Sequence, residues 1–270
     1  MRWVCLGFAI LSAGCSTGKE RLEAAGATVT ENAVNREGLV VDARNVAVPA
    51  DAPLGAVLDA AESAKYVYAV SIEGQTVDCG AIARLAALPD LRGLTLRNTD
   101  TPAGCLDALI GEGRLQSFAV EGMPYTTDEL RWLGKAWQLR TVAVPGTRVD
   151  DGFGEVLRRV LAVERVIVSD TAVGDAFVAK LAEHVHLKQL VLDRTNVTGA
   201  GLMALAENAS VERVHAAHLR PDDVMDYINA AKGLKQIVLD VTAVEAQSAT
   251  QRNTNGVRVL TPEAGATIRL

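Results

Sequence analysis

The sequence predicts an α/β solenoid, in which short strands stack into one parallel inner sheet and short helices cover its outer side. Three observations predict this class of fold. Apolar triplets recur every 24 residues, and each triplet has strand spacing and is followed by helix spacing. Aromatic residues make up only 4% of the chain, as suits many small, equivalent layers. A chain of 270 residues, 49% of them hydrophobic, can bury such a core.

The first half of each repeated unit carries three apolar residues at its first, fourth and sixth positions. In one central unit these are Leu187, Leu190 and Leu192. Positions that are occupied alternately by apolar and by variable residues indicate a strand with one buried face. The units begin at about residues 43, 67, 91, 115, 139, 163, 187, 211 and 234, and a last stub follows at Val257.

The second half of each unit keeps the same register. Thr recurs at 99, 147, 171, 195 and 242, and Val recurs at 77, 149, 173, 197 and 244. Apolar pairs three residues apart follow, such as Leu202 and Leu205, and this spacing predicts one or two turns of helix. We expect the Thr hydroxyl to satisfy a backbone group at the corner after the strand, because a buried polar atom needs a partner.

The resulting pattern, LxxLxLxxTxVxxxxLxxL, resembles the leucine-rich repeat in the 24-residue form found in many bacterial proteins, with Thr where the commoner repeat has Asn. The resemblance covers residues 43–256 and implies a leucine-rich-repeat solenoid with a parallel inner sheet and short outer helices. The physics agrees, because one unit cannot bury its apolar face alone whereas stacked units share a continuous core.

The segments that flank the repeats are expected to close the ends of the stack. Residues 15–42 comprise a tether and an N-terminal cap, in which Val29 and the run 39–41 are expected to form a small hairpin over the first layer. This segment also resembles the N-terminal part of repeat-containing bacterial lipoproteins. At the other end, residues 245–256 are too polar for a normal unit's helix and predict an irregular turn, and residues 257–270 predict a C-terminal cap. Two units depart from the pattern, with Gly154 at an apolar helix position and Leu219 and Pro221 where Thr and Val belong.

The N-terminus has the layout of a secretory signal peptide over residues 1–14. Arg2 is followed by an apolar run that is too short to span a bilayer as a helix of roughly 20 residues. The ending Ser-Ala-Gly-Cys resembles a bacterial lipobox, which implies that Cys15 is the site of lipid attachment. Ser16 after it favours the outer membrane, by resemblance to Gram-negative lipoproteins. A plain signal peptide that is cut nearby is the alternative.

Two further cysteines, Cys79 and Cys105, occupy nearly equivalent places in consecutive units. Neighbouring layers of a parallel stack lie about 4.8 Å apart, so these thiols are expected within disulfide range in an oxidising periplasm. Two buried free thiols are the alternative.

Alternate residues of the inner strands are expected to face the concave surface of the stack. One such row is small and apolar in its middle, whereas polar side chains collect toward the C-terminal units. A binding face, if the protein has one, is therefore expected there. Its candidate residues are Arg165, Gln189, Asp193, Arg194, Arg213, His215 and His218.

Composition and motifs favour a binding protein over an enzyme. The 27 basic and 33 acidic side chains give a net charge of −6, which disfavours nucleic acid as a partner. The four His have no metal-ligand spacing, and the sequence has neither a phosphate-binding loop nor a nucleophile elbow. No catalytic residue, metal or cofactor is expected. The sequence thus predicts a membrane-tethered module of the bacterial envelope that binds a protein or another envelope component. The alternatives are a structural lipoprotein without a specific partner, or an enzyme on the concave C-terminal strands with His215 beside Asp193 and Asp240, or with Ser169 and Asp170.

Overall fold

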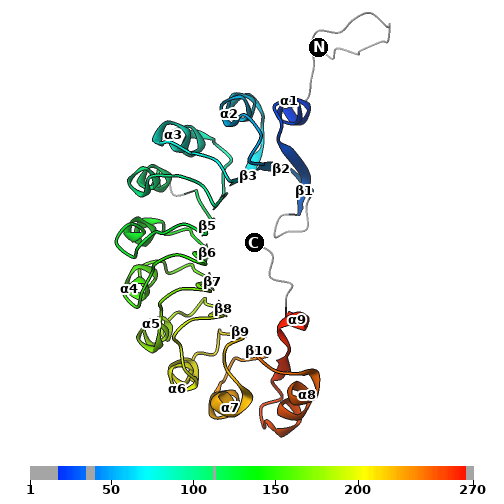
Figure 1. Cartoon of the computed structure of the whole chain (residues 1–270), viewed down its shortest axis with the longest axis vertical. Coiled ribbons are helices and arrows are strands. Elements are labelled where there is room, and N and C mark those ends of the chain that lie inside the picture. Colours follow the sequence, from blue (N-terminus) through cyan, green and yellow to red (C-terminus); the bar gives the residue numbers. More distant parts are fainter. Residues whose placement is uncertain (1–17, 35–39, 112–113, 266–270) are drawn as a thin grey trace, which may run out of the picture.

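The computed structural model describes residues 18–34, 40–111 and 114–265. These residues form an arc, with the strands along its inner side and most of the helices along its outer side (Figure 1). The described strands form one sheet, in which they follow one another in sequence order. They are β1 (Thr28–Val34), β2 (Val40–Val48), β3 (Val67–Glu73), β4 (Gly93–Arg97), β5 (Ser117–Glu121), β6 (Thr141–Ala143), β7 (Arg165–Ile167), β8 (Gln189–Val191), β9 (Arg213–Ala216), β10 (Gln236–Leu239) and β11 (Arg258–Leu260). All neighbouring strands from β2 onward are parallel.

The helices are short and follow the strands one unit at a time. Several are 3-10 helices, here labelled η. The described helices are α1 (Gly18–Ala24), α2 (Leu54–Ser63), α3 (Cys79–Ala87), η1 (Ala103–Ile110), η2 (Arg131–Lys135), α4 (Phe153–Leu157), α5 (Asp175–Leu181), α6 (Gly199–Leu202), η3 (Met203–Leu205), α7 (Pro221–Ala230), α8 (Ala243–Arg252) and α9 (Pro262–Gly265).

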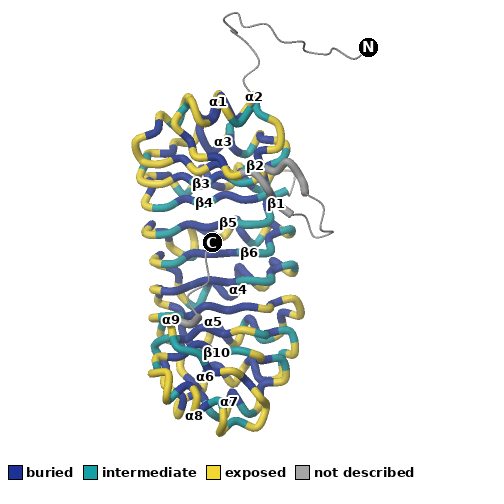
Figure 2. Tube along the Cα trace, turned by 90° about the vertical axis from the view of Figure 1, so that its right-hand side faces the viewer, coloured by how far each residue is buried: buried dark blue, intermediate teal, exposed yellow. Residues whose placement is uncertain are grey.

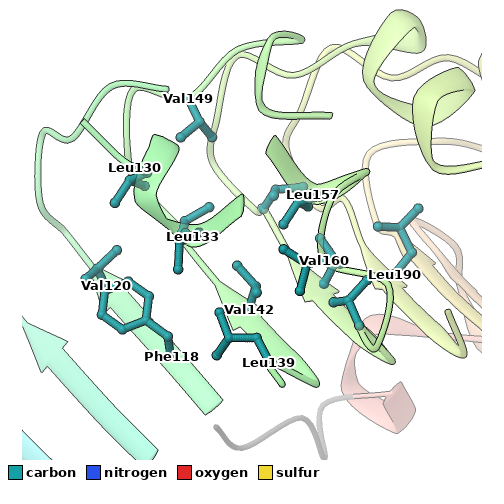
Figure 3. Close-up of a cluster of buried hydrophobic side chains, with 14 of the residues drawn as sticks. Phe118, Val120, Leu130, Leu133, Leu139, Val142, Val149, Leu157, Val160 and Leu190 are labelled. Carbon is teal, nitrogen blue, oxygen red and sulfur yellow. The ribbon is translucent and has the colours of Figure 1, made fainter. Parts of the chain in front are cut away.

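The core lies between the sheet and the helices and runs the length of the arc. Figure 3 shows how successive units contribute to it: Phe118 and Val142 come from neighbouring strands, and Leu133 and Leu157 from the helices outside them. All four side chains are completely buried. The predicted repeat of apolar triplets and pairs is therefore the repeat of the core.

The corner after each strand explains the recurring Thr. The hydroxyls of Thr147, Thr171 and Thr195 each donate to the carbonyl oxygen three residues earlier, at 2.6 to 2.7 Å. This confirms the expected role at these three positions, whereas the hydroxyl of Thr99 contacts the side chains of Thr101 and Met123. The residue just before the Thr position has a positive φ in six consecutive units, which the apolar pattern did not reveal. These corner residues are Gly74, Asn98, Gly122, Gly146, Asp170 and Arg194.

The N-terminal cap contains the expected hairpin. Strand β1 pairs antiparallel with β2, so that Val29 lies opposite Val46, and Val40 lies opposite Val34. Position 39 of the expected run lies outside the described residues. Strand β2 serves both as the hairpin's second strand and as the first strand of the parallel stack, because its other edge pairs with β3. The hairpin thus covers the first layer of the solenoid.

The prediction of an irregular turn over residues 245–256 is wrong, because most of this segment is the ten-residue helix α8. Thr242 accepts from the backbone N–H of Glu245, and Glu245 accepts from that of Thr242, so the helix begins with a reciprocal capping box. Only Ala246 and Ala249 are buried. A helix in the last layers has little core to cover, which is why it tolerates a polar composition.

Gly154 has a steric reason to depart from the apolar pattern. A Cβ atom at this position would lie 2.9 Å from the Cβ atom of Lys180 on the neighbouring helix α5. The adjacent Phe153, Val156 and Leu157 supply the buried surface of α4 instead. In the unit from 211, Leu219 is buried and Pro221 is the first residue of α7.

Candidate functional site

The concave face is built from rows of side chains that run across the strands. Figure 2 looks onto this face, where the strands form successive rungs. The central row, which we call the apolar row, comprises Ala119, Ala143, Ile167 and Val191 on β5 to β8. These residues are only 0 to 6% exposed and form an apolar cluster separate from the main core. The row continues with His215 on β9.

A second concave row alternates Arg and Gln over five neighbouring strands. Arg165 on β7, Gln189 on β8 and Arg213 on β9 are in register, as the sequence predicts. The same register continues through Gln236 on β10 to Arg258 on β11. The sequence-based candidates omitted these last two residues, although the same repeat frame places them in the row.

The three arginines of this row, Arg165, Arg213 and Arg258, are named the arginine row. Arg213 and Arg258 are exposed and Arg165 is half-buried. Within the part of the chain that the structure describes, none of their guanidinium groups has an ion-pair or hydrogen-bond partner.

Charges at the rim beside this row are paired. We call Arg140, Glu164, Lys188, Glu212 and Lys235 the rim row, because each precedes a concave strand residue. Glu164 accepts from both Arg140, at 2.7 Å, and Lys188, at 2.9 Å. Lys235 donates to Glu212 at 2.7 Å, and this hydrogen bond is the main reason that the pKa of Glu212 lies below its usual range. The rim carboxylates are thus already occupied by rim cations.

A groove with a volume of about 740 Å³ lies along the concave face. Its walls include Thr95 and Ser117 in the first half and Thr141, Arg165 and Arg213 in the second half. The lining contains more cations than carboxylates, although the chain as a whole is acidic.

Four of the predicted site residues, which are Asp193, Arg194, His215 and His218, do not line the groove. Arg194 follows β8 at a positive-φ corner and pairs with Asp170 of the preceding layer. His218 follows β9, and its ring nitrogen Nε2 is 2.8 Å from the carbonyl oxygen of Val197. The strands here are only three or four residues long, so positions after their ends belong to the corners. The placement of Arg194 and His218 on the concave strands is wrong, and so is that of Asp193, which also follows the end of β8.

Asp193 and His215 occupy intermediate places. Asp193 accepts a hydrogen bond from the backbone N–H of Ala217 in the next layer, at 2.7 Å, and so helps to fix the corner. His215 is 8% exposed, and burial lowers the pKa of its imidazole, against an opposing effect of Asp193. His215 is therefore a buried residue of the concave face and not part of the groove lining.

The geometry gives the catalytic alternatives little support. Among the described residues, no three His, Cys, Asp or Glu side chains are grouped closely enough to hold a metal ion, which includes the set of His215, Asp193 and Asp240. Asp170 is engaged by Arg194, so its carboxylate is not directed at His215.

Cys79 and Cys105 are joined as a disulfide, with their Cα atoms 5.0 Å apart. The bond links the start of α3 to η1 in the next layer, away from the concave face. It therefore ties two helical segments together and contributes no side chain to the groove.

A second surface feature lies on the edge of the stack. Trp137, Leu161 and Val185 occupy the same position in three consecutive units and are 63, 72 and 74% exposed. A hollow with a volume of about 370 Å³ beside them is lined by Arg159 and His186, among others. It also shares Arg140 and Glu164 with the concave groove, so the two features adjoin.

The predicted signal peptide and Cys15 lie outside the described residues. Within residues 18–34, 40–111 and 114–265, no helix has the length and apolar character needed to cross a membrane.

The fold is that of a leucine-rich-repeat solenoid, with one inner strand for each 24-residue unit. Among solved structures, it is similar to TLR13 in a complex with ssRNA13, with a TM-score of 0.50 and 13% identity over 72% of this chain and 28% of that chain. An internalin from Listeria monocytogenes gives a TM-score of 0.49 and 14% identity over 70% of this chain and 51% of that chain. The chain therefore spans about half, or less, of the length of these proteins. No family model and no curated protein sequence matches this chain.

Proposed function

We propose that this chain is a non-enzymatic protein-interaction module whose concave face is its binding surface. The observation that carries the proposal is the open groove of about 740 Å³, in whose lining the guanidinium groups of Arg165 and Arg213 have no ion-pair or hydrogen-bond partner among the described residues. Unpaired arginines at a concave surface favour recognition, because Arg is enriched at the centres of protein interfaces. Solenoids commonly use such extended concave surfaces for binding.

Site-specific photo-crosslinking in cells tests this proposal. A photoreactive amino acid at Thr141, which lines the groove, is expected to give adducts of discrete mass. The matched control is Asp107, which is exposed on η1 at the outer side. Adducts from Asp107 but none from Thr141 would place the interaction elsewhere and contradict the proposal.

The second part of the proposal is that Cys15 carries a lipid that tethers the module to the cell envelope, in the outer membrane. The lipobox-like sequence at its N-terminus supports this, and a disulfide is consistent with an oxidising compartment. Multiple acyl chains would anchor the chain stably without a membrane-spanning helix.

Intact-mass spectrometry of membrane-extracted protein tests the tether. The wild type is expected to begin at Cys15 and to carry added acyl mass, whereas Cys15→Ser is expected to lack that mass and to leave the membrane fraction. An unacylated wild-type protein in the soluble fraction would contradict the tether and leave the concave-face proposal intact.

A further inference from the structure

We infer that the partner contributes an acidic polypeptide segment, whose carboxylates pair with the arginine row along the concave groove. This inference rests on the proposed function and specifies the chemistry of its partner. It follows from three features of the concave face, namely which charges are already paired, how the arginines are spaced, and how little of the adjacent apolar row is exposed.

The first feature is the separation of paired from unpaired charges. The rim carboxylates Glu164 and Glu212 accept from Arg140, Lys188 and Lys235. The arginine row lies on the adjacent positions of the same strands, yet its side chains have no ion-pair or hydrogen-bond partner within the described residues, although the charge of Arg213 contributes to the lowered pKa of Glu212. Because the internal carboxylates are occupied, a carboxylate from outside is the natural partner for these guanidinium groups. Arg also matches carboxylates well, because its planar fork allows bidentate hydrogen bonds.

The second feature is the spacing of the row. Its arginines lie on every second strand from β7 to β11, and neighbouring strands are about 4.8 Å apart, which separates consecutive arginines by roughly 10 Å. An extended polypeptide advances about 3.3 Å per residue, so residues three apart match this spacing. Gln236, which is partly exposed, lies between Arg213 and Arg258, whereas Gln189, between Arg165 and Arg213, is only 4% exposed. The amide of Gln236 can both donate and accept hydrogen bonds, as a peptide backbone requires.

The third feature is the burial of the apolar row, which lies next to the arginine row on β7 but is not part of the groove lining. The apolar row is 0 to 6% exposed, so a partner can remove little further apolar area from water there. At the arginine row, affinity must therefore come mainly from polar and charged contacts. Binding dominated by such contacts is expected to weaken as the salt concentration rises.

A polypeptide fits this face better than a nucleic acid. Single-stranded nucleic acids are typically held by aromatic stacking platforms together with a continuous positive track. Among the described residues that line the groove, Tyr68 alone is aromatic, so the groove offers no series of stacking platforms.

Binding of the full chain to an array of random peptides of about ten residues, long enough to cross five strands, tests the inference. Bound peptides are expected to be enriched in Asp and Glu at positions three apart. Arg165→Gln and Arg213→Gln are each expected to weaken the best peptides about tenfold. Lys135→Gln removes the same charge from an exposed residue of η2 and is expected to leave affinity unchanged.

Several outcomes would overturn the inference. The first is that the bound peptides are not enriched in Asp and Glu. The second is that no peptide loses affinity when Arg165 or Arg213 is replaced by Gln. The third is that a mixed-sequence single-stranded oligonucleotide binds the chain more tightly than the best peptides do. Peptide binding that appears only when the chain is ended at Gly265 would make residues 266–270 the occupant of the groove and would also overturn it. If any of these results is obtained but the photoreactive residue at Thr141 gives protein adducts, the protein-interaction proposal stands and only the acidic-segment inference fails. If Thr141 gives no adducts, both the proposal and the inference fail.

Discussion

Two buried tyrosines differ in whether their hydroxyl groups have a hydrogen-bond partner. Tyr125 is 5% exposed and donates to the carbonyl oxygen of Thr101 at 2.6 Å, and burial raises the pKa of its phenol to about 12. Tyr227 is 1% exposed, and its hydroxyl has no partner among the described residues. A buried hydroxyl without a partner costs free energy, whereas a bonded one contributes about 1 kcal/mol.

Tyr125→Phe is expected to lower the free energy of unfolding by about 1–2 kcal/mol, because it leaves a carbonyl without its donor. Tyr227→Phe is expected to leave it unchanged or to raise it by up to about 1 kcal/mol, because it removes an unsatisfied group. Urea denaturation of both variants measures the difference. Equal destabilisation by the two substitutions would contradict this division.

His184 is expected to make stability depend on pH. It is 5% exposed, and burial lowers the pKa of its imidazole, with a smaller effect from the charge of His186. The unfolded chain, with an ordinary His pKa of about 6.5, then binds more protons than the folded chain as the pH falls. Stability should therefore be constant at high pH and decrease below about pH 6.5, until the folded-state pKa is reached.

Denaturation midpoints between about pH 8 and 5 test this dependence. His184→Gln is expected to flatten the decrease, although the lowered pKa of His215 should leave part of it. The exposed His186 supplies the matched variant His186→Gln. If the stability of His184→Gln decreased with falling pH as steeply as that of the wild type, His184 would not contribute to the pH dependence.

At the scale of the element, the positive-φ corner recurs in six consecutive units although its residue type varies. Gly, Asn and Asp adopt this conformation with little strain, and Arg194 adopts it with more. The corner therefore depends on backbone conformation, and no single residue type marks it in the sequence.

Gly146→Ala is expected to lower the free energy of unfolding by about 1–2 kcal/mol, because its φ of 67° disfavours any side chain, although a Cβ atom would make only an ordinary contact, 3.6 Å from the backbone of Gly122. The matched variant is Gly55→Ala in α2, where a Cβ atom would meet nothing within 4 Å and φ is not positive. That substitution should be neutral or stabilise by up to about 1 kcal/mol. Thermal unfolding compares the two, and equal effects would exclude the corner's φ as the cause.

The apolar pattern predicted the strands and the core because the buried positions of each unit require apolar residues, which recur visibly in the sequence. It did not predict α8, whose identity depends on the capping box at Thr242 and on its place near the end of the stack. In the candidate site, the pattern predicted Arg165, Gln189 and Arg213 through the register. It misplaced Arg194 and His218, because periodicity gives the phase of a strand but not the residue at which it ends.

At the scale of the whole molecule, a repeat array has two exposed ends that need protection. The N-terminal end is closed by β1 along the edge of β2 and by α1, whose Leu22 is completely buried. Without this cap, the unpaired backbone of β2 would offer a template for another chain.

A chain that starts at residue 40 is therefore expected to self-associate with rising concentration. A chain that starts at residue 18 retains α1 and β1 and is expected not to gain this tendency. Size-exclusion chromatography with light scattering distinguishes the two. A truncated chain that remains monomeric at the same concentrations would show that the edge of β2 needs no cover.

The alternation of Arg and Gln has a consequence for how such a protein can change over evolutionary time. Each rung supplies one member of the row, and a unit duplicated in frame would repeat the chemistry of its parent. Duplicating one unit would place two like side chains next to each other and break the alternation. Duplicating a neighbouring pair would lengthen the row by one complete Arg–Gln period. The groove can thus be adapted to longer targets by copying units in pairs, without inventing a new contact.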